Sequence, residues 1–224
     1  MNKVSDSIGW ADFTVNPVRG LCPLACKDMA GKEYCYARRM YKRFYWPPEI
    51  WFAASTLWQI ERLKKPSRIF VGSTMELFGP WVRWEWLNAI FVTAQKHPQH
   101  TFIFLTKMPL ELQNWSPFPD NAWVGFSATN QAQYNEGIVG MAGVKAAVKF
   151  VSFEPLLQPI HPVGAYDLSE LNWVILGSQT QPVRHPHREW VTEIIRSANS
   201  ADIPVFLKEP LASYLGIERK ENPW

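Results

Sequence analysis

From residue 68 onward, the sequence alternates short apolar runs with polar clusters and longer helical stretches. The apolar runs are β-branched or aromatic and do not alternate with polar residues, which is typical of strands buried on both faces of a parallel sheet. We predict six strands here, at Arg68 to Val71, Thr101 to Leu105, Ala122 to Phe126, Lys149 to Val151, Asn172 to Leu176 and Pro204 to Leu207. An earlier run, Asp12 to Val15, would be the seventh.

Helical periodicity marks the stretches between these runs. In residues 81–98 the apolar positions that share one side are Trp84, Leu87, Ile90, Phe91 and Ala94, and in residues 188–204 they are Trp190, Val191, Ile194 and Ile195. A further helix is predicted from Tyr36 to Phe44. Helices that connect parallel strands produce repeated βα units. We therefore predict an α/β fold, a single domain over residues 1–224 that forms a partial or irregular (β/α) barrel of about six to seven parallel strands.

Polar clusters follow the apolar runs directly, where the carboxyl ends of the strands should meet. They are Gly72 to Glu76, Thr106 and Lys107, Ser127 to Asn130, Ser152 to Pro155, Gly177 to Thr180, and Lys208 and Glu209. In βα barrels this rim is where sites are built. A Ser or Thr at such a place also caps the helix that follows. Capping does not explain the larger polar residues that recur at equivalent places, namely Glu76, Lys107, Glu154, Gln179 and Lys208.

All three cysteines of the chain lie near its start, at Cys22, Cys26 and Cys35. An odd, clustered set of this kind indicates metal or redox chemistry rather than a disulfide framework. Thiolates select zinc or iron–sulfur clusters, and three of them leave one metal position unfilled. The first histidine is His97, so a closed zinc site needs a distant ligand. An open iron–sulfur cluster, a zinc site and three unrelated thiols all remain interpretations at this point.

Positive charge gathers around these cysteines, although the whole chain has a formal net charge of only +3. Residues 19–43 hold Arg19, Lys27, Lys32, Arg38, Arg39, Lys42 and Arg43 against Asp28 and Glu33. This pattern is either a solvated helix face or a rim that binds anions. The Trp- and Pro-rich stretch from Tyr45 to Trp51 is expected to be a packed loop. No apolar run is long enough to span a bilayer and no secretory signal is recognisable, so we expect a cytoplasmic protein without a membrane partner.

Several short segments occur in the order of a known family. They are WADFTVNPVRGLC, CYARRM, IFVGSTMELF, FIFLTKMP, VGFSATN, VSFEPLL and NWVILGSQT, and they extend from Trp10 to about Lys208. In these segments the chain resembles an uncharacterised, phage-associated family of radical-SAM-like proteins, in the radical S-adenosylmethionine (SAM) superfamily. One departure is the spacing of the cysteines. Most radical SAM proteins have two residues between the second and third cysteines, and this chain has eight, Lys27 to Tyr34.

The resemblance implies an enzyme with a [4Fe–4S] cluster held by Cys22, Cys26 and Cys35. SAM would chelate the open iron, and an electron donor would reduce the cluster to cleave SAM into methionine and a 5′-deoxyadenosyl radical. The substrate is unknown, and nucleic acid or a nucleotide is the class we expect because of the basic cysteine segment. The oligomeric state is not indicated by the sequence.

The resemblance also assigns roles to residues at the rim. Those implied to bind SAM are Tyr34, Gly72, Ser73, Thr74, Glu76, Ser127, Thr129, Gly177, Ser178 and Gln179. Glu154 would bind SAM or orient the substrate, or else pair with a lysine such as Lys107 or Lys208. Lys107 could instead contact a substrate anion, and we take Glu154 and Lys107 as the catalytic candidates. His185 and His187 form an H-x-H pair that suits the start of a helix better than a metal site.

Two other functions are open. The first is a zinc-clipped module that binds nucleic acid without catalysis. The second is a metal-free barrel hydrolase that uses Glu76 and Glu154 as an acid–base pair, and it leaves the cysteines unexplained.

Overall fold

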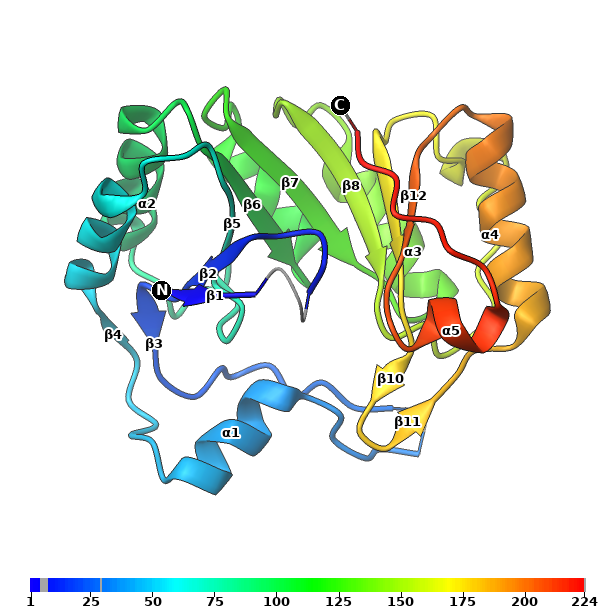
Figure 1. Cartoon of the computed structure of the whole chain (residues 1–224), viewed down its shortest axis with the longest axis horizontal. Coiled ribbons are helices and arrows are strands. Elements are labelled where there is room, and N and C mark those ends of the chain that lie inside the picture. The colour runs from blue at the N-terminus through cyan, green and yellow to red at the C-terminus, as the bar shows by residue number, and fades with distance from the viewer. Residues whose placement is uncertain (5–7, 29, 224) are drawn as a thin grey trace.

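A central sheet organises the computed structural model, which describes residues 1–4, 8–28 and 30–223 (Figure 1). Within these residues the sheet has eight strands in the order β1-β2-β5-β6-β7-β8-β9-β12, all parallel except β1. Their bounds are β1 Asn2–Lys3, β2 Phe13–Val15, β5 Arg68–Val71, β6 Thr101–Thr106, β7 Ala122–Ser127, β8 Val148–Phe153, β9 Trp173–Leu176 and β12 Val205–Leu207. All seven predicted strands are confirmed. The sheet ends at β1 and β12, so the fold is a partial barrel.

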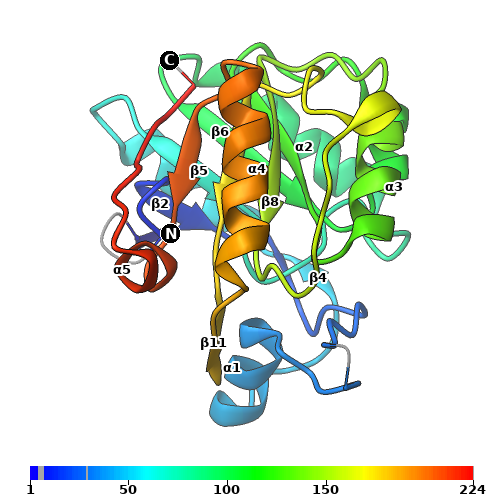
Figure 2. The same cartoon turned by 90° about the vertical axis from the view of Figure 1, so that its right-hand side faces the viewer.

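Helices pack on the outer side of this sheet or lie beyond the carboxyl ends of its strands (Figures 1 and 2), and three of them were predicted. The predicted ones are α1 (Tyr36–Phe44), α2 (Trp84–Lys96) and α4 (Arg188–Ser200). The remaining helical segments are η1 (Ala54–Arg62), η2 (Pro109–Trp115), α3 (Gln131–Met141), η3 (Gly164–Tyr166) and α5 (Leu211–Leu215). None of the helices in the described part of the chain is long and apolar enough to cross a membrane.

The buried side of α2 differs from the prediction at one position. Leu87, Ile90, Phe91 and Ala94 are buried as expected, but Trp84 is 62% exposed. Trp84 is the first residue of the helix, and its ring stacks on Trp115 of η2 with ring centroids 6.5 Å apart. The placement of Trp84 on the core side was therefore wrong.

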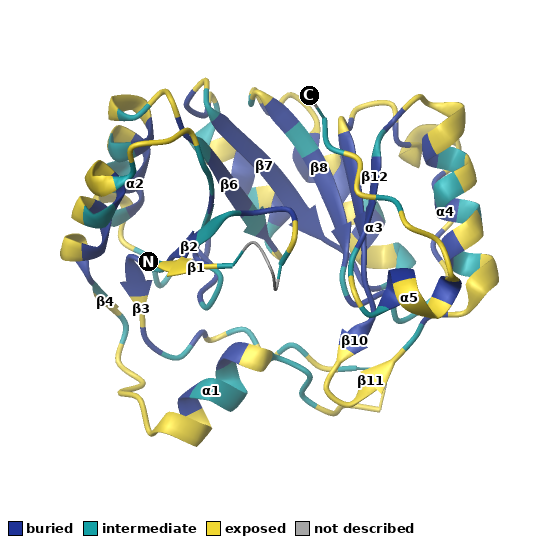
Figure 3. Ribbon diagram, in the orientation of Figure 1, coloured by how far each residue is buried: buried dark blue, intermediate teal, exposed yellow. Residues whose placement is uncertain are grey.

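Two hydrophobic cores lie on opposite faces of the sheet, because successive residues of a strand point to opposite faces. The larger core fills the space between the sheet and the outer helices. The smaller one fills the inside of the partial barrel with Trp10, Ala11, Ile103, Trp123, Val148, Phe150, Trp173, Ile175 and Phe206. Figure 3 shows the strands almost wholly buried and the outer faces of α2 and α4 exposed.

Two excursions of the chain project beyond the carboxyl ends of the strands. The first carries the cysteines, α1 and a short pair of antiparallel strands, β3 (Val18–Arg19) and β4 (Trp51–Phe52). The second is the hairpin of β10 (Gln179–Thr180) and β11 (Val183–Arg184). α1 and this hairpin lie side by side in both views (Figures 1 and 2). Arg39 joins them by donating to the Gln181 carbonyl at 3.1 Å, and Arg184 pairs with Asp28 at 3.5 Å.

The stretch from Tyr45 to Trp51 is not the packed loop that the sequence suggested. Tyr45, Trp46 and Trp51 all have exposed side chains. The reason is that these three side chains belong to neither hydrophobic core, whereas Ile50 of the same stretch packs against the larger one.

Candidate functional site

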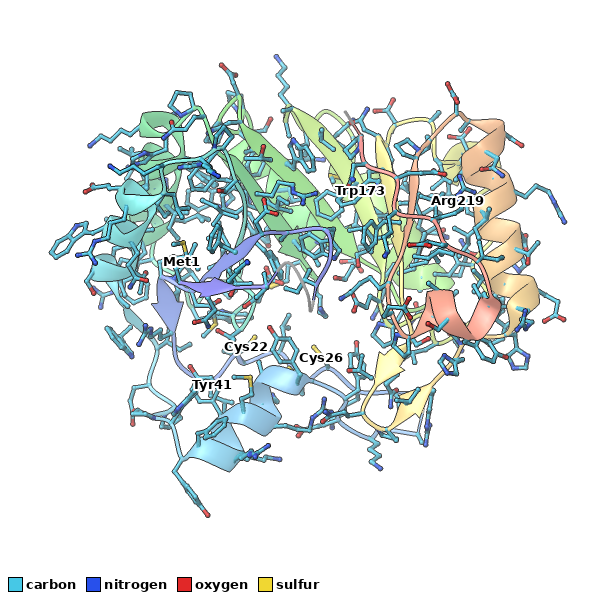
Figure 4. All side chains as sticks on the ribbon, viewed as in Figure 1. Met1, Cys22, Cys26, Tyr41, Trp173 and Arg219 are labelled. Carbon is cyan, nitrogen blue, oxygen red and sulfur yellow. The ribbon has the colours of Figure 1, made fainter. Side chains whose placement is uncertain are left out.

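A cavity of about 810 Å³ lies between the cysteine excursion and the carboxyl ends of the strands. All three cysteines line it, and Figure 4 shows Cys22 and Cys26 between α1 and the sheet. Most of the predicted rim residues line the same cavity, namely Tyr34, Gly72, Ser73, Thr74, Glu76, Lys107, Ser127, Glu154, Ser178 and Gln179. The fold thus brings residues from well-separated parts of the chain to one place, as the rim pattern predicted.

Thr129 and Gly177 are not among the residues that line this cavity. The hydroxyl and the backbone N–H of Thr129 both donate to Gln133 Oε1 at 2.9 Å, at the start of α3. Gly177 packs against Glu154, and a Cβ at this glycine would lie 3.0 Å from Glu154 Cγ. A contact of either residue with a cofactor stays a prediction.

The segment between Cys26 and Cys35, of which all residues but Met29 are described, folds back on itself. Lys27 and Glu33 form an antiparallel bridge, and the Tyr34 N–H donates to the Cys26 carbonyl at 3.1 Å. Asp28 holds the turn, because its Oδ1 accepts from the N–H groups of Ala30 at 3.0 Å and Lys32 at 2.9 Å. The long spacing therefore returns Cys35 to the side of Cys26.

Cys26 and Cys35 are in hydrogen-bond contact, and their environments differ. The hydrogen bond from the Cys26 thiol, with the N–H groups of Arg38 and Ala37 at the start of α1, lowers the pKa of Cys35. The same hydrogen bond and burial raise the pKa of Cys26. The Lys107 ammonium favours the thiolate of both residues. Cys22 is buried, and this burial raises its pKa.

Arg38 fixes the backbone around the first cysteine. Its guanidinium donates to three successive carbonyls, those of Cys22 at 2.8 Å, Pro23 at 3.3 Å and Leu24 at 3.3 Å. Glu33 lies 3.6 Å from the same guanidinium. Because α1 carries both Arg38 and the residues that follow Cys35, the helix ties the two ends of the cysteine segment together.

Glu76 has a buried carboxylate whose two oxygens accept three hydrogen bonds. Oε1 accepts from the Thr106 hydroxyl at 2.7 Å and the Phe78 N–H at 3.1 Å, and Oε2 accepts from the Lys107 N–H at 2.7 Å. The carboxylate thus joins the carboxyl ends of β5 and β6. These three donors use three of the roughly four acceptor sites of the carboxylate, so Glu76 has a structural role at this edge of the sheet.

Glu154 pairs with Lys208, one of the two partners considered from the sequence. Lys208 Nζ lies 2.5 Å from Glu154 Oε1. The pair joins the ends of β8 and β12 across β9 and lines the cavity. Lys107, the other candidate, faces the thiols instead.

Three buried polar atoms in the wall of the cavity have no hydrogen-bond partner within the described residues. They are Trp10 Nε1, Ser152 Oγ and Gln179 Oε1. Buried polar atoms are nearly always paired, and an unpaired set around one cavity fits a polar ligand. Asn16 is a further lining residue that the sequence did not indicate; its Oδ1 accepts from Ser73 Oγ and from the Thr74 N–H, each at 3.2 Å.

His185 and His187 do not form a pair. His185 Nδ1 lies 2.9 Å from Ser178 Oγ and its ring stacks on Tyr214, whereas His187 precedes α4 and lies against Trp190. Across residues 1–4, 8–28 and 30–223, no three His, Cys, Asp or Glu side chains converge to hold a single metal ion. In a [4Fe–4S] cluster each cysteine binds a different iron, so three thiols around one cavity fit such a cluster without converging on one point.

Comparisons with known proteins agree with this fold. A family model described as a protein of unknown function (DUF5131) matches residues 5–214. A solved structure of a spore photoproduct lyase variant is similar, with a TM-score of 0.58, 11% identity, and coverage of 92% of this chain and 78% of that one. A second variant, with bound AdoMet and dinucleoside spore photoproduct, has a TM-score of 0.50 at 12% identity. The match covers 88% of this chain and 63% of the length of that second variant. No protein in a search of curated proteins matches the sequence.

Proposed function

The chain belongs to this family of proteins of unknown function (DUF5131), and we propose that it is a radical SAM enzyme. The observation that carries the proposal is the cavity at the carboxyl ends of the parallel strands, lined by three thiols and by the polar residues that follow the strands. The likeness of the fold to spore photoproduct lyase, a radical SAM enzyme, supports it.

Cys22, Cys26 and Cys35 would hold a [4Fe–4S] cluster. When bound and reduced, the cluster supplies one electron to SAM, which breaks the C5′–S bond and yields methionine and a 5′-deoxyadenosyl radical. Neighbouring groups of the protein favour the form and position in which the cysteines bind iron. The N–H groups at the start of α1 and the Lys107 ammonium favour thiolate at Cys35, and Arg38 keeps the backbone of the first cysteine in place.

The SAM molecule would occupy the polar part of the cavity beside the cysteines. Asn16 holds Ser73 and Thr74 in place, and Glu76 keeps the ends of β5 and β6 together. Ser152 Oγ and Gln179 Oε1 have no partner within the described residues, and they would hydrogen-bond polar groups of the ligand. We assign Tyr34, Gly72, Ser127 and Ser178 to the walls of the same pocket and leave Thr129 and Gly177 as supports.

The catalytic candidates Glu154 and Lys107 have different surroundings. Glu154 is held by Lys208 at the edge of the cavity, so the ion pair would orient a substrate that enters there. Lys107 would bind a substrate anion or balance the negative charge of the thiolates. The substrate class that we propose is nucleic acid or a nucleotide. One of the structural neighbours contains AdoMet and a dinucleoside photoproduct, which supports both SAM and this class.

The test is anaerobic purification followed by analysis for iron, sulfide and zinc. We expect about four iron and four sulfide per chain, and 5′-deoxyadenosine formed from SAM on reduction. Cys22→Ser, Cys26→Ser and Cys35→Ser should each lose the cluster, whereas Ser197→Ala on α4 should retain it. Stoichiometric zinc without iron would overturn the proposal in favour of the zinc-clipped module.

A further inference from the structure

An exposed aromatic and basic surface surrounds the far end of α1. We call it the aromatic rim, and it consists of Arg19, Lys42, Arg43, Phe44, Tyr45, Trp46 and Trp51. Its four aromatic residues lie within residues 44–51, and all are exposed, Tyr45 to 92%. Soluble proteins rarely expose contiguous aromatic side chains unless the patch binds something.

The rings of the aromatic rim are held in place. Trp46 stacks on Phe44 with ring centroids 5.5 Å apart, and its ring meets the edge of Tyr41 at 5.2 Å. Trp51 is fixed by β4, and the guanidinium of Arg19 on the paired strand β3 lies 5.5 Å from the centre of its ring. The rings of Phe44, Trp46 and Trp51 are therefore held by contacts while their side chains remain exposed, which suits a stacking surface.

Positive charge surrounds these rings. Helix α1 has four basic residues and no acidic one. Two of them, Arg38 and Arg39, are tied to backbone carbonyls, and Lys42 pairs with Glu33 at 3.2 Å. Arg43 lies 5.4 Å from the Phe44 ring, and no ion pair of Arg43 or Arg19 with a carboxylate is found in the described part of the chain. The positive charges of Arg19 and Arg43 therefore remain free to bind a polyanion.

The aromatic rim is continuous with the cavity of the cysteines. Arg19, Trp46 and Trp51 line that cavity together with Cys22, Cys26 and Cys35. Figure 4 shows Tyr41, on which Trp46 packs, on the face of α1 near Cys22. A ligand that stacks on the rim is therefore at the opening of the site.

We propose that the aromatic rim binds a single strand of nucleic acid, with bases stacked on Trp46 and Trp51 and phosphates paired with Arg19 and Arg43. Stacking on aromatic side chains needs base faces that are free, which a single strand offers and a duplex does not. The margin holds one exposed carboxylate, Glu49, for which no ion pair is found in the described residues, but the two unpaired arginines outnumber it. This excess of positive charge favours a polyanion over a protein partner. The delivery of a nucleotide to the cavity rests on the proposed function, but the binding of the strand does not.

The test measures binding of fluorescein-labelled oligothymidine, of oligouridine and of a duplex by fluorescence anisotropy, with the complete chain. We expect single strands to bind more tightly than the duplex. Trp46→Ala/Trp51→Ala should weaken binding of the single strands by roughly 25-fold or more, since each of the two stacked bases contributes roughly 5-fold or more. Arg19→Glu/Arg43→Glu should reduce the slope of log affinity against log salt by about 0.7 for each phosphate that is no longer paired.

Matched variants separate the loss of stacking on the rim from nonspecific effects of removing a tryptophan or reversing charge. Trp58→Ala removes an exposed tryptophan that lines a different, small cavity with Met1 and Arg62, and Lys64→Glu/Lys65→Glu reverses the same amount of charge elsewhere. Both should bind as the unmodified chain does. Trp46→Phe/Trp51→Phe keeps two stacking rings and should retain most of the affinity, which keeps the test valid if the double alanine variant fails to fold.

Two results would overturn the proposal. One is the absence of strand binding at low salt, with or without self-association of the chain through the rim. The other is an affinity for single strands that is the same in the unmodified chain, in the double alanine variant of Trp46 and Trp51, and in the double glutamate variant of the two rim arginines. Formation of 5′-deoxyadenosine from SAM without added strand is measured in parallel. Radical chemistry without strand binding rejects this inference alone, and strand binding without iron or SAM cleavage rejects the proposed function alone.

Discussion

Arg38 shows how a single side chain can hold a loop that has little regular structure. Its guanidinium is the donor to three successive carbonyls at Cys22, Pro23 and Leu24. The sequence indicated only that a basic residue lies at this place. It could not indicate that the charge is directed at backbone oxygens, because that depends on how the excursion folds back over α1.

Replacing this side chain should loosen the cysteine loop. Arg38→Ala leaves the three carbonyls without their donor, so we expect the free energy of unfolding to fall by about 1–3 kcal/mol. We also expect the iron content after reconstitution to fall. Chemical denaturation of the apoprotein and iron analysis measure the two effects. Arg196→Ala, at an exposed position of α4, is the control and should change neither. Unchanged stability and iron content in Arg38→Ala would contradict this role.

The cysteines should differ in reactivity when no cluster is bound. The pKa of Cys35 is lowered, so its thiolate persists as the pH falls below the ordinary thiol range, whereas Cys26 and Cys22 have raised pKa values and stay protonated. In the apoprotein at about pH 7, iodoacetamide should therefore modify Cys35 first. Mass spectrometry of peptides after timed alkylation measures the order.

Two variants test the cause of this order. Cys26→Ala removes the thiol that donates to Cys35, so it should raise the pKa of Cys35 and slow its alkylation at the same pH. Cys22→Ala should leave the rate at Cys35 nearly unchanged. Equal rates at all three cysteines in the unmodified apoprotein would contradict the pKa difference.

At the scale of elements, the cysteine excursion depends on close contact between two backbone segments. Gly20 has φ +116°, and a Cβ there would lie 2.4 Å from the Glu49 carbonyl oxygen. The Gly20 N–H donates to the Tyr41 hydroxyl at 2.7 Å, which fixes the segment against α1. A residue with a side chain would have to separate β3 from the segment that leads into β4.

Gly20→Ala should therefore destabilise the protein through both conformation and collision. We expect a loss of about 2–4 kcal/mol in the free energy of unfolding, measured by urea denaturation. Gly143→Ala is the matched control, because Gly143 also has a positive φ, +72°, but a Cβ at this position would have no atom within 4 Å. Its cost should be about 1 kcal/mol. Equal losses in the two variants would show that the contact with Glu49 is unimportant.

The elements that the sequence predicted are those whose patterns carry their own signal. The seven strands are continuous apolar runs, and α1, α2 and α4 have strong periodicity. Helix α3 lacks such a pattern because two glycines, Gly137 and Gly140, let it approach Phe126 and Pro109 closely. The turn that returns Cys35 to Cys26 depends on Asp28 accepting from backbone N–H groups, a local contact that hydrophobic patterning does not indicate.

At the scale of the whole molecule, the rim pattern located the site but not all of its walls. Residues at the ends of strands could be found because parallel strands bring their carboxyl ends together. Asn16 directly follows β2 and so fits this pattern, but it was not among the predicted residues. Trp10, Trp46 and Trp51 could not be found in this way, since they reach the cavity from the N-terminal segment and from the excursion. The single-domain, cytoplasmic and phage-associated character of the chain stays a prediction.

Trp10 links the inner core to the cavity. Its ring is 2% exposed and packs on Phe70 and Trp173, with centroids 4.9 Å and 6.3 Å away, while its Nε1 is one of the unpaired polar atoms of the cavity wall. The side chain therefore has a ring that packs in the core and an N–H group that has no partner within the described residues. Two substitutions can separate these parts.

Trp10→Ala should lose about 3–5 kcal/mol of unfolding free energy because the ring leaves a hole in the inner core. Trp10→Phe keeps an aromatic ring and removes an unpaired N–H, so its stability should stay within about 1.5 kcal/mol of the unmodified chain. If the N–H donates to bound SAM, Trp10→Phe should nevertheless weaken SAM binding roughly 5- to 10-fold, measured by equilibrium dialysis on the reconstituted protein.

Trp173→Phe is the control, and we expect the opposite result for it: reduced stability with unchanged SAM binding. Trp173 belongs to the same core but does not line the cavity, and its Nε1 donates to the Glu221 carbonyl at 2.9 Å. Losing that hydrogen bond should cost about 1–3 kcal/mol of stability and leave SAM binding unchanged. If both phenylalanine variants lose stability alike and bind SAM like the unmodified chain, then Trp10 serves only the core and the ligand lies closer to the cysteines than to the inner face of the sheet.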